Sequence, residues 1–256
     1  MEEQIFRSLT VLADGEKVTG YRRARLTGRD ALGLLPLPFT LRLWNLADSD
    51  YYLLSSAGEV SVRCEGSVLA SGKVSDVYRR LVPEGTLTEL IFSPGLPLWE
   101  ARVSLSVEAG VFVSETVRQI LEASGTGISL LSWVGEDPVR SRPQVFFGRA
   151  AECVDEALSA ADAKAYITGD GLCMVPEDGL PVSMELTEAD LLDAPSKVAG
   201  NRMILRTRPV GWPLGKQVAV MWKGQSLEGL VTERSVDADT MEGNWQAELI
   251  IAMHNA

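Results

Sequence analysis

The sequence has almost no residues suited to metal or covalent chemistry. Its single histidine, His254, stands near the end of the 256 residues, and the three cysteines, Cys64, Cys153 and Cys173, are far apart with no CxxC pair. A structural zinc site and a disulfide framework therefore lack ligands and partners. A Ser-His-Asp or Cys-His centre would depend on that one histidine. No catalytic, cofactor-binding or metal-binding residue is assigned.

Long apolar runs and phosphate-binding motifs are also missing. No run reaches the ~18 residues that a membrane-spanning helix needs, so we expect no membrane insertion. The first four residues, Met1 to Gln4, are acidic where a signal peptide would be basic, which predicts folding in a cytoplasm. The sequence holds no GxxxxGK[ST], GxGxxG or GxSxG motif.

Positive charge is scarce in the middle of the chain. The net charge is −11, and residues 111–200 carry 6 Lys and Arg against 15 Asp and Glu. A protein that grips phosphates needs the opposite sign, so specific nucleic-acid binding is not expected. Solvation explains such carboxylates, and so does a surface that must not adhere to nucleic acid; the sequence leaves both explanations open.

Strand patterns fill the first part of the chain, residues 1–110. Apolar residues alternate with polar ones in "LPFTLRLWNL", and Asp14-Gly15 and Glu65-Gly66 are hairpin turn signals between extended runs. About six to eight short strands with prolines at their edges predict a sandwich or a barrel.

The apolar period changes at Val113 and indicates a small α/β unit over residues 111–185. Ser114 is placed as the N-cap of a first helix that stops at Gly125. In a second helix the apolar residues recur at intervals of three and four, so Cys153 is predicted to be a buried small hydrophobe. A hairpin around Gly169-Asp170-Gly171 follows, which completes the order helix, strand, helix, hairpin.

Strand signals return in residues 186–256, after a short capped helical turn that begins at Thr187. Four or five strands are expected, one hairpin turning at Lys223-Gly224 and the last strand following the turn from Met241 to Asn244. The order of pieces is therefore β, then α/β, then β, and the chain is expected to be mainly β with an α/β insert.

Acidic clusters are the best candidates for an enzyme. One surrounds the predicted hairpin and another precedes the last strand, and two carboxylates can hydrolyse a glycosidic bond if one is kept protonated. Asp and Glu are also common in turns, where they serve solvation and local hydrogen bonds, and this structural interpretation is favoured. The calcium-loop spacing DxDxDG is absent. The residues considered are Asp170, Glu177, Asp178, Glu233, Asp237 and Asp239.

Two of the six tryptophans stand out. Trp212 lies between Gly211 and Pro213 in a loop, so it is the candidate for contact with a partner or a glycan. Trp245 opens the last strand and is expected to be a structural anchor in the core. Truncation of a buried large aromatic residue to alanine costs about 3–5 kcal/mol, which is the effect predicted for Trp245→Ala.

The succession of motifs resembles the central hub proteins of phage tail baseplates, the late-control-D-type family that also occurs in phage-tail-like bacteriocins. "SETVRQILEASGTGI" is similar to the helix that opens the family's small central domain, and "VFFGRAAECVDEALSAADAKAYITGDGLCMVP" to its strand, helix and hairpin. "GWPLGKQV", "GLVTERSVDAD" and "EGNWQAELII" resemble parts of its last β domain. The first section matches only in β content and order.

The resemblance implies a homotrimeric structural protein. Each subunit would supply two tail-tube-like β-barrel domains, at 1–110 and 186–256, around the small α/β domain at 111–185. Three copies would present a pseudo-sixfold ring to the hexameric tail tube protein and a threefold face to the central spike protein, with other baseplate proteins as further partners. The implied location is the baseplate of a virion or tail-like particle, assembled in the bacterial host cytoplasm.

Three alternatives stay open at this stage. Another tail-tip protein, such as a distal-tail or tube ring, predicts six copies. A tail-associated glycan hydrolase predicts activity that depends on Glu177 or Asp178. A monomeric glycan-binding module predicts sugar affinity through Trp212.

Overall fold

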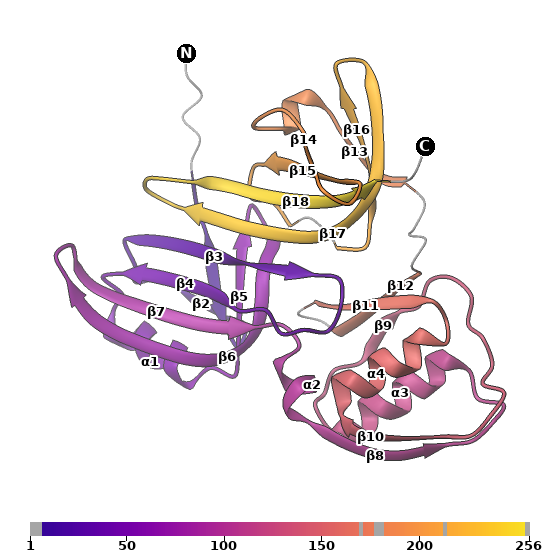
Figure 1. Ribbon diagram of the computed structural model, residues 1–256. Helices are drawn as coiled ribbons and strands as arrows, with labels where there is room; N and C mark the ends of the chain where they lie inside the picture. The colour runs from indigo at the N-terminus through magenta and orange to yellow at the C-terminus, as the bar shows by residue number, and fades with distance from the viewer. Residues whose placement is uncertain (1–6, 169–170, 177–181, 212–213, 254–256) are drawn as a thin grey trace.

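The computed structural model describes residues 7–168, 171–176, 182–211 and 214–253. The protein is mainly β, as expected. One large sheet of 13 strands carries both β sections, and two small sheets belong to an α/β unit between them (Figure 1). Trp212 lies outside the described residues, as do Asp170, Glu177 and Asp178.

The first β section is a strongly curved part of the large sheet. Its strand order is β3-β4-β7-β6-β5-β1-β2. Buried and partly exposed residues alternate along its strands. In β4, Phe39, Leu41 and Leu43 are buried and the residues between them are not. The elements are β1 (Thr10–Ala13), β2 (Glu16–Val18), β3 (Arg23–Ala31), β4 (Phe39–Trp44), α1 (Asp48–Ser56), β5 (Glu59–Cys64), β6 (Ser67–Val82) and β7 (Gly85–Ser93).

Two-residue turns close hairpins where the sequence signals them. Asp14 and Gly15 have φ values of 47° and 83° between β1 and β2, and Glu65 and Gly66 have 49° and 86° between β5 and β6. Positive φ at both central positions is the type of turn that matches the twist of the flanking strands. These hairpin predictions are confirmed.

Helix α1 was not predicted. Its sequence, DSDYYLLSS, buries only Leu54 completely, so it lacks the apolar stripe that identifies a helix in a sequence. Arg79 of β6 holds the helix in place, because its guanidinium pairs with Asp48 at 2.6 Å and lies over the ring of Tyr51 at 5.0 Å.

The second β section follows the α/β unit, and its strand order is β14-β15-β18-β17-β16-β13. Lys223 and Gly224 turn at φ 49° and 76° between β16 and β17, and Thr187 makes a capping box with Asp190, both as the sequence predicts. The elements are β13 (Val182–Leu186), η1 (Glu188–Asp190), β14 (Ser196–Val198), β15 (Arg202–Thr207), β16 (Gln217–Trp222), β17 (Gln225–Asp239) and β18 (Trp245–Met253).

Strands β17 and β18 belong to both β sections. Val231, Leu249 and Ile251 at the base of this hairpin pack in the core of the second section. Val236 and Ala247 nearer its tip pack in the core of the first section. The hairpin therefore runs across the boundary, as Figure 1 shows.

The expectation of two closed barrels is not met in the strand pairing. The path of paired strands runs from β2 at one end to β14 at the other, and no closed barrel forms among the described residues. The physical reason is the length of β17, whose first half pairs with β16 and whose second half pairs with β3. Two curved sections in one open sheet take the place of two separate cylinders.

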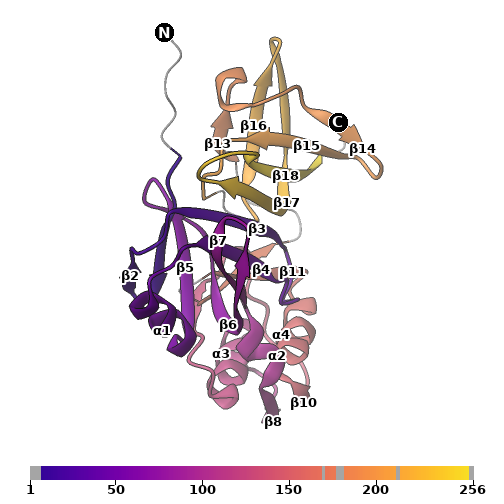
Figure 2. The same cartoon turned by 90° about the vertical axis from the view of Figure 1, so that its left-hand side faces the viewer.

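The α/β unit is built in three layers. Helices α3 and α4 lie between a two-stranded ribbon of β8 and β10 and a three-stranded sheet in the order β11-β12-β9 (Figures 1 and 2). The elements are α2 (Leu96–Glu100), β8 (Arg102–Val107), α3 (Val113–Ser124), β9 (Leu130–Ser132), β10 (Gln144–Arg149), α4 (Ala150–Ser159), β11 (Ala163–Thr168) and β12 (Gly171–Pro176).

Residues 96–107 pack with this unit, although the sequence predicts that they belong to the first β section. Leu98, Val103 and Val107 lie in the core that α3 and α4 form. Strand β8 has an alternating pattern that suits any half-buried strand. Its true partner, β10, lies more than thirty positions further along the chain, and the pattern of β8 itself does not specify that partner.

The predicted helices are present, with one difference at a helix start. Gly125 ends α3 at φ 64°, and Cys153 is buried in the apolar stripe of α4, both as predicted. The prediction of Ser114 as N-cap is wrong, since α3 begins at Val113. The carboxylate of Asp137 accepts hydrogen bonds from the Ser114 backbone N–H and hydroxyl at 2.9 and 2.6 Å, so a residue from a distant loop caps this helix.

No helix in the described part of the chain is both long enough and apolar enough to cross a lipid bilayer.

Candidate functional site: an arginine–aspartate seam

The two β sections meet where β3 pairs with the second half of β17. Seven residue pairs, from Glu233↔Ala31 to Asp239↔Arg25, join the strands in antiparallel register. Charged side chains of opposite sign lie along this seam on both faces of the sheet. Such pairs fix register, because a shift by one residue would move each charge to the opposite face.

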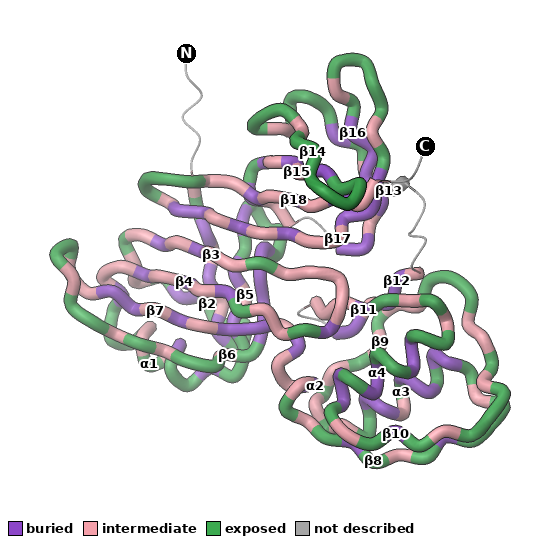
Figure 3. Tube along the Cα trace, in the orientation of Figure 1, coloured by how far each residue is buried: buried purple, intermediate pink, exposed green. Residues whose placement is uncertain are grey.

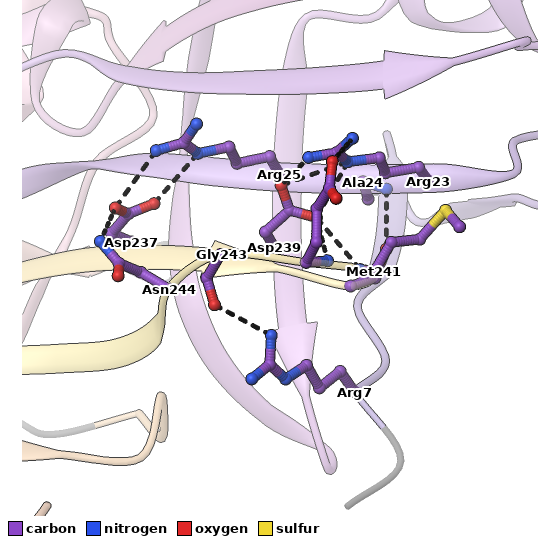
Figure 4. A network of polar contacts seen from close by, with 11 residues as sticks. Arg7, Arg23, Ala24, Arg25, Asp237, Asp239, Met241, Gly243 and Asn244 are labelled. Carbon is purple, nitrogen blue, oxygen red and sulfur yellow. Dashed lines mark hydrogen bonds and ion pairs between the residues drawn. The ribbon is translucent and has the colours of Figure 1, made fainter. Parts of the chain in front are cut away.

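Two ion pairs lie on the outer face of the seam. The Arg23 guanidinium binds both carboxylate oxygens of Asp239, with Nη2 to Oδ2 at 2.5 Å and Nε to Oδ1 at 3.0 Å. Arg25 binds Asp237 in the same two-pronged way at 3.1 and 3.2 Å. Figure 4 shows both arginines of β3 pointing to the aspartates of β17.

A third ion pair lies on the opposite face with reversed polarity. Arg234 of β17 donates to Asp30 of β3, with Nη2 to Oδ2 at 2.5 Å and Nε to Oδ1 at 3.0 Å. Both side chains are mostly buried, with 9% and 14% exposed. A buried pair of this kind contributes little net stability, but removal of one partner is costly, so it favours a single alignment of the strands.

Asp239 is the most deeply buried acid of the seam, with 2% of its side chain exposed. Burial by itself would raise the pKa of this carboxyl. Hydrogen bonds from Arg23 and from the backbone N–H groups of Met241 and Glu242 outweigh burial and hold the pKa of Asp239 below its usual value. The residue is therefore a permanent anion at neutral pH.

The turn between β17 and β18 is tied to the seam and to the start of the chain. Asn244 donates to Asp237 at 2.7 Å, and Arg7 donates to the carbonyl of Gly243 at 3.1 Å. The next residue, Trp245, is partly buried against the core of the first section, and the Arg7 guanidinium lies 6.0 Å from the centre of its ring. Trp245 thus packs where an anchor is expected but is less buried than predicted.

The acidic residues considered for catalysis are paired with arginines where they are described. Glu233 pairs with Arg202 at 3.3 Å, and Asp237 and Asp239 belong to the seam. Two carboxylates that share a site would instead raise one pKa. Within the described ranges no group of three His, Cys, Asp or Glu residues is placed to hold a metal ion.

The buried cysteines are unsuited to act as nucleophiles. Burial raises the pKa of Cys64 to about 11 and also raises the pKa of Cys153. A thiol becomes reactive through a lowered pKa, so both residues serve as small core side chains.

A cavity of about 550 Å³ lies between the first β section and the α/β unit. Its charged lining residues are Glu59, Lys73 and Glu100, and Lys73 pairs with Glu100 at 2.7 Å. The cavity is bordered by chain turns, including Gly95 and Gly127.

The seam was not recognised from the sequence, although its residues carry a signal. "RRARLTGRD" places Arg23 and Arg25 two positions apart in β3, and "ERSVDAD" places Asp237 and Asp239 two positions apart in β17. Two alternating strands of opposite charge suit cross-strand pairing. Each segment alone is also an ordinary solvated strand face, so the signal becomes specific only when the pairing is known.

Neither the protein-family models nor the curated proteins give a match to this sequence. The solved structures do. A tail protein from Neisseria meningitidis MC58 matches at 11% identity and a TM-score of 0.71, over 96% of this chain and 96% of that chain.

Two further solved structures are similar over the same share of this chain, 96%. One is an Escherichia coli component of the type VI secretion system that exhibits structural similarity to the T4 bacteriophage tail proteins gp27 and gp5, with 11% identity, a TM-score of 0.71 and 77% of that chain covered. The other is the 43 kDa tail protein of prophage MuSo2 from Shewanella oneidensis, with 12% identity, a TM-score of 0.63 and 98% of that chain covered. The chain therefore has the fold of these three proteins.

Proposed function

We propose that this protein is a structural component of a phage tail or phage-tail-like particle, and within it the central hub of the baseplate. The observation that carries the proposal is the fold likeness to tail proteins over 96% of the chain, which includes both β sections and the α/β unit. The order of motifs that resembles the late-control-D-type hubs supports the finer assignment.

The seam suits the proposed role because a symmetry adaptor must hold two β sections in one fixed relation. Three copies would then supply six similar β sections to a hexameric tail tube and a threefold face to a central spike. Backbone pairing together with three two-pronged ion pairs resists rotation of one section against the other. A flexible linker between the sections would leave the ring geometry undefined.

The role is proposed to be structural and not enzymatic. The described carboxylates of the acidic cluster, those of Glu233, Asp237 and Asp239, each form an ion pair with an arginine instead of facing one another across an open site. The excess of acidic residues fits a surface past which DNA travels without adhering.

Two long hairpins project from the same side of the molecule and are proposed to contact neighbouring subunits (Figure 1). Strand β6 carries Tyr78 and Leu81, which are 53% and 86% exposed, and the turn after β17 carries Met241, which is 67% exposed. Apolar side chains that stay this exposed on projecting hairpins are typical of surfaces that become buried in an assembly.

Native mass spectrometry of the purified chain tests the hub assignment. The proposal predicts a species of three times the 27.8 kDa subunit mass. Leu81→Asp should shift this species toward the monomer, and Leu131→Asp, which changes an exposed leucine of β9, should not. Six copies would favour a distal-tail or tube ring instead, and a strict monomer at micromolar concentration would argue against both.

A further inference from the structure

The ribbon of β8 and β10 has one face that no other described residue covers. Val103, Val107 and Phe146 point inward and are buried against α3 and α4. On the opposite face Val145 and Phe147 are 66% and 80% exposed. The ribbon lies on the far side of the helices from both β sections (Figures 1 and 3).

The two chain segments of the ribbon differ in charge from the rest of the protein, although one of their arginines, Arg149, already pairs with Glu152 at 3.4 Å. Opposite Val145 and Phe147 stand Ser106 and Ser104, and the next pair along is Arg102 with Arg149. The two chain segments that form the ribbon and its extension, residues 102–113 and 138–149, contain four arginines and one glutamate, whereas the whole chain has a net charge of −11. The ribbon is a basic and apolar region on an acidic protein.

Beyond the ribbon the same two segments stay side by side as far as Phe112 and Val139, and Arg140 lies in this extension. Its guanidinium carbon is 5.3 Å from the centre of the Phe146 ring, while Nε and Nη1 are buried with no hydrogen-bond acceptor among the described residues. A buried donor without an acceptor destabilises the folded state. The side chain therefore lies in a place that calls for an acceptor.

A cavity of about 370 Å³ adjoins this arginine. Arg140, Arg142 and Gln144 contribute polar groups to its lining, and Val139 contributes an exposed apolar side chain. Neither arginine forms an ion pair with a described acidic residue. A carboxylate matches a guanidinium well, because it accepts two parallel N–H hydrogen bonds.

We propose that this end of the α/β unit is a docking site for an acidic, extended segment of a partner protein. One carboxylate of the segment enters the cavity and accepts hydrogen bonds from Arg140. Apolar side chains of the same segment cover Val145 and Phe147, and a second acidic side chain lies near Arg102. Both strands of the ribbon have one edge unpaired among the described residues, so the segment can also extend the sheet.

Position favours a different protein over a second copy of this chain, because the face points away from the projecting hairpins that are proposed to join the copies. The docking proposal does not depend on whether the assembly contains three copies or six. A negative result for the docking site would therefore leave the proposed hub role unaffected.

Fluorescence anisotropy with the full chain tests the site. The probe is a labelled peptide of about eight residues, the length of a typical strand, in which glutamates alternate with valine and serine. A matched peptide carries glutamine in place of each glutamate. The proposal predicts that the glutamate peptide binds at least about tenfold more tightly, since hydrogen bonds between charged partners are the stronger ones.

Variants separate binding from folding. Arg140→Met should weaken binding of the glutamate peptide at least about tenfold while the melting temperature stays unchanged or rises, because the substitution removes buried donors that lack an acceptor. Phe147→Ser should weaken both peptides, and Arg118→Gln, a change in an exposed pair with Glu115, should change neither.

Three results would overturn the proposal. The first is equal affinity for the glutamate and glutamine peptides. The second is full binding by Arg140→Met, or a fall in its melting temperature, which would assign Arg140 a purely structural role. The third is a loss of subunits from the native complex on Phe147→Ser with peptide binding intact, which would make a second copy of the chain the occupant of this face.

Discussion

Removal of the Arg23 side chain should destabilise the protein far more than removal of an exposed arginine. In the folded state Arg23 supplies three of the hydrogen bonds that Asp239 accepts and stacks on Trp44 at 4.6 Å. Arg23→Ala leaves a carboxylate that is almost fully buried with only the two backbone donors of Met241 and Glu242.

The size of the effect follows from burial. Loss of one partner from a buried ion pair costs about 3–5 kcal/mol. The two remaining backbone donors reduce that cost, so we expect the free energy of unfolding to fall by about 2–4 kcal/mol. Asp239→Asn keeps an acceptor for the backbone donors and should cost less, about 1–2 kcal/mol.

Urea denaturation followed by tryptophan fluorescence measures these changes, and a double-mutant cycle isolates the pair. Arg118→Ala is the control, because its exposed pair with Glu115 should contribute less than about 0.5 kcal/mol. The combination of Arg23→Ala and Asp239→Asn should cost clearly less than the sum of the two single changes. If Arg23→Ala behaves like the control, or the two changes add without coupling, the seam does not hold the β sections in the way described.

Three other predictions concern acid, the last strand and the helix start. The pKa of Asp239 is lowered on folding, so its stabilising contribution is complete above the unfolded-state pKa of about 3.9 and is lost as the pH falls through the lower folded-state value. The difference in unfolding free energy between the native chain and Asp239→Asn should therefore become smaller from pH 6 to pH 2. A constant difference in urea titrations would contradict this. Trp245→Ala should lower the free energy of unfolding measured by urea denaturation by about 1–3 kcal/mol. This is below the range for a fully buried ring, because Trp245 is only partly buried. A change near zero would show that it is no anchor. Asp137→Ala should lower the free energy of unfolding by about 1–2 kcal/mol and speed amide hydrogen exchange at the start of α3. Unchanged exchange at Ser114 would rule out the cap.

Local sequence patterns predicted the elements whose conformation is determined by residues close together in the sequence. Asp14-Gly15, Glu65-Gly66 and Lys223-Gly224 gave correct hairpins, because positive φ at both turn residues is a property of the turn itself. The apolar stripe of α4 predicted its buried face for the same reason. Helix α1 was missed since only Leu54 is fully buried, and no stripe distinguishes it from a loop.

Long-range pairings could not be predicted from pattern alone. The seam joins residues about 200 positions apart, and the charges of β3 and β17 carry no information on register until the strands are adjacent. The same limit explains β8, whose alternation fitted the first β section as well as its true partner, β10. The cap on Ser114 likewise comes from Asp137, outside the helix and its neighbouring residues.

Electron microscopy of the purified complex, classified by rotational symmetry, tests the central claim that two rigidly joined β sections in each copy let a trimer match a six-membered ring. The account predicts a threefold particle in which six similar β densities surround the axis, three from each kind of section. A particle with strict sixfold symmetry, or isolated subunits without a ring, would contradict it.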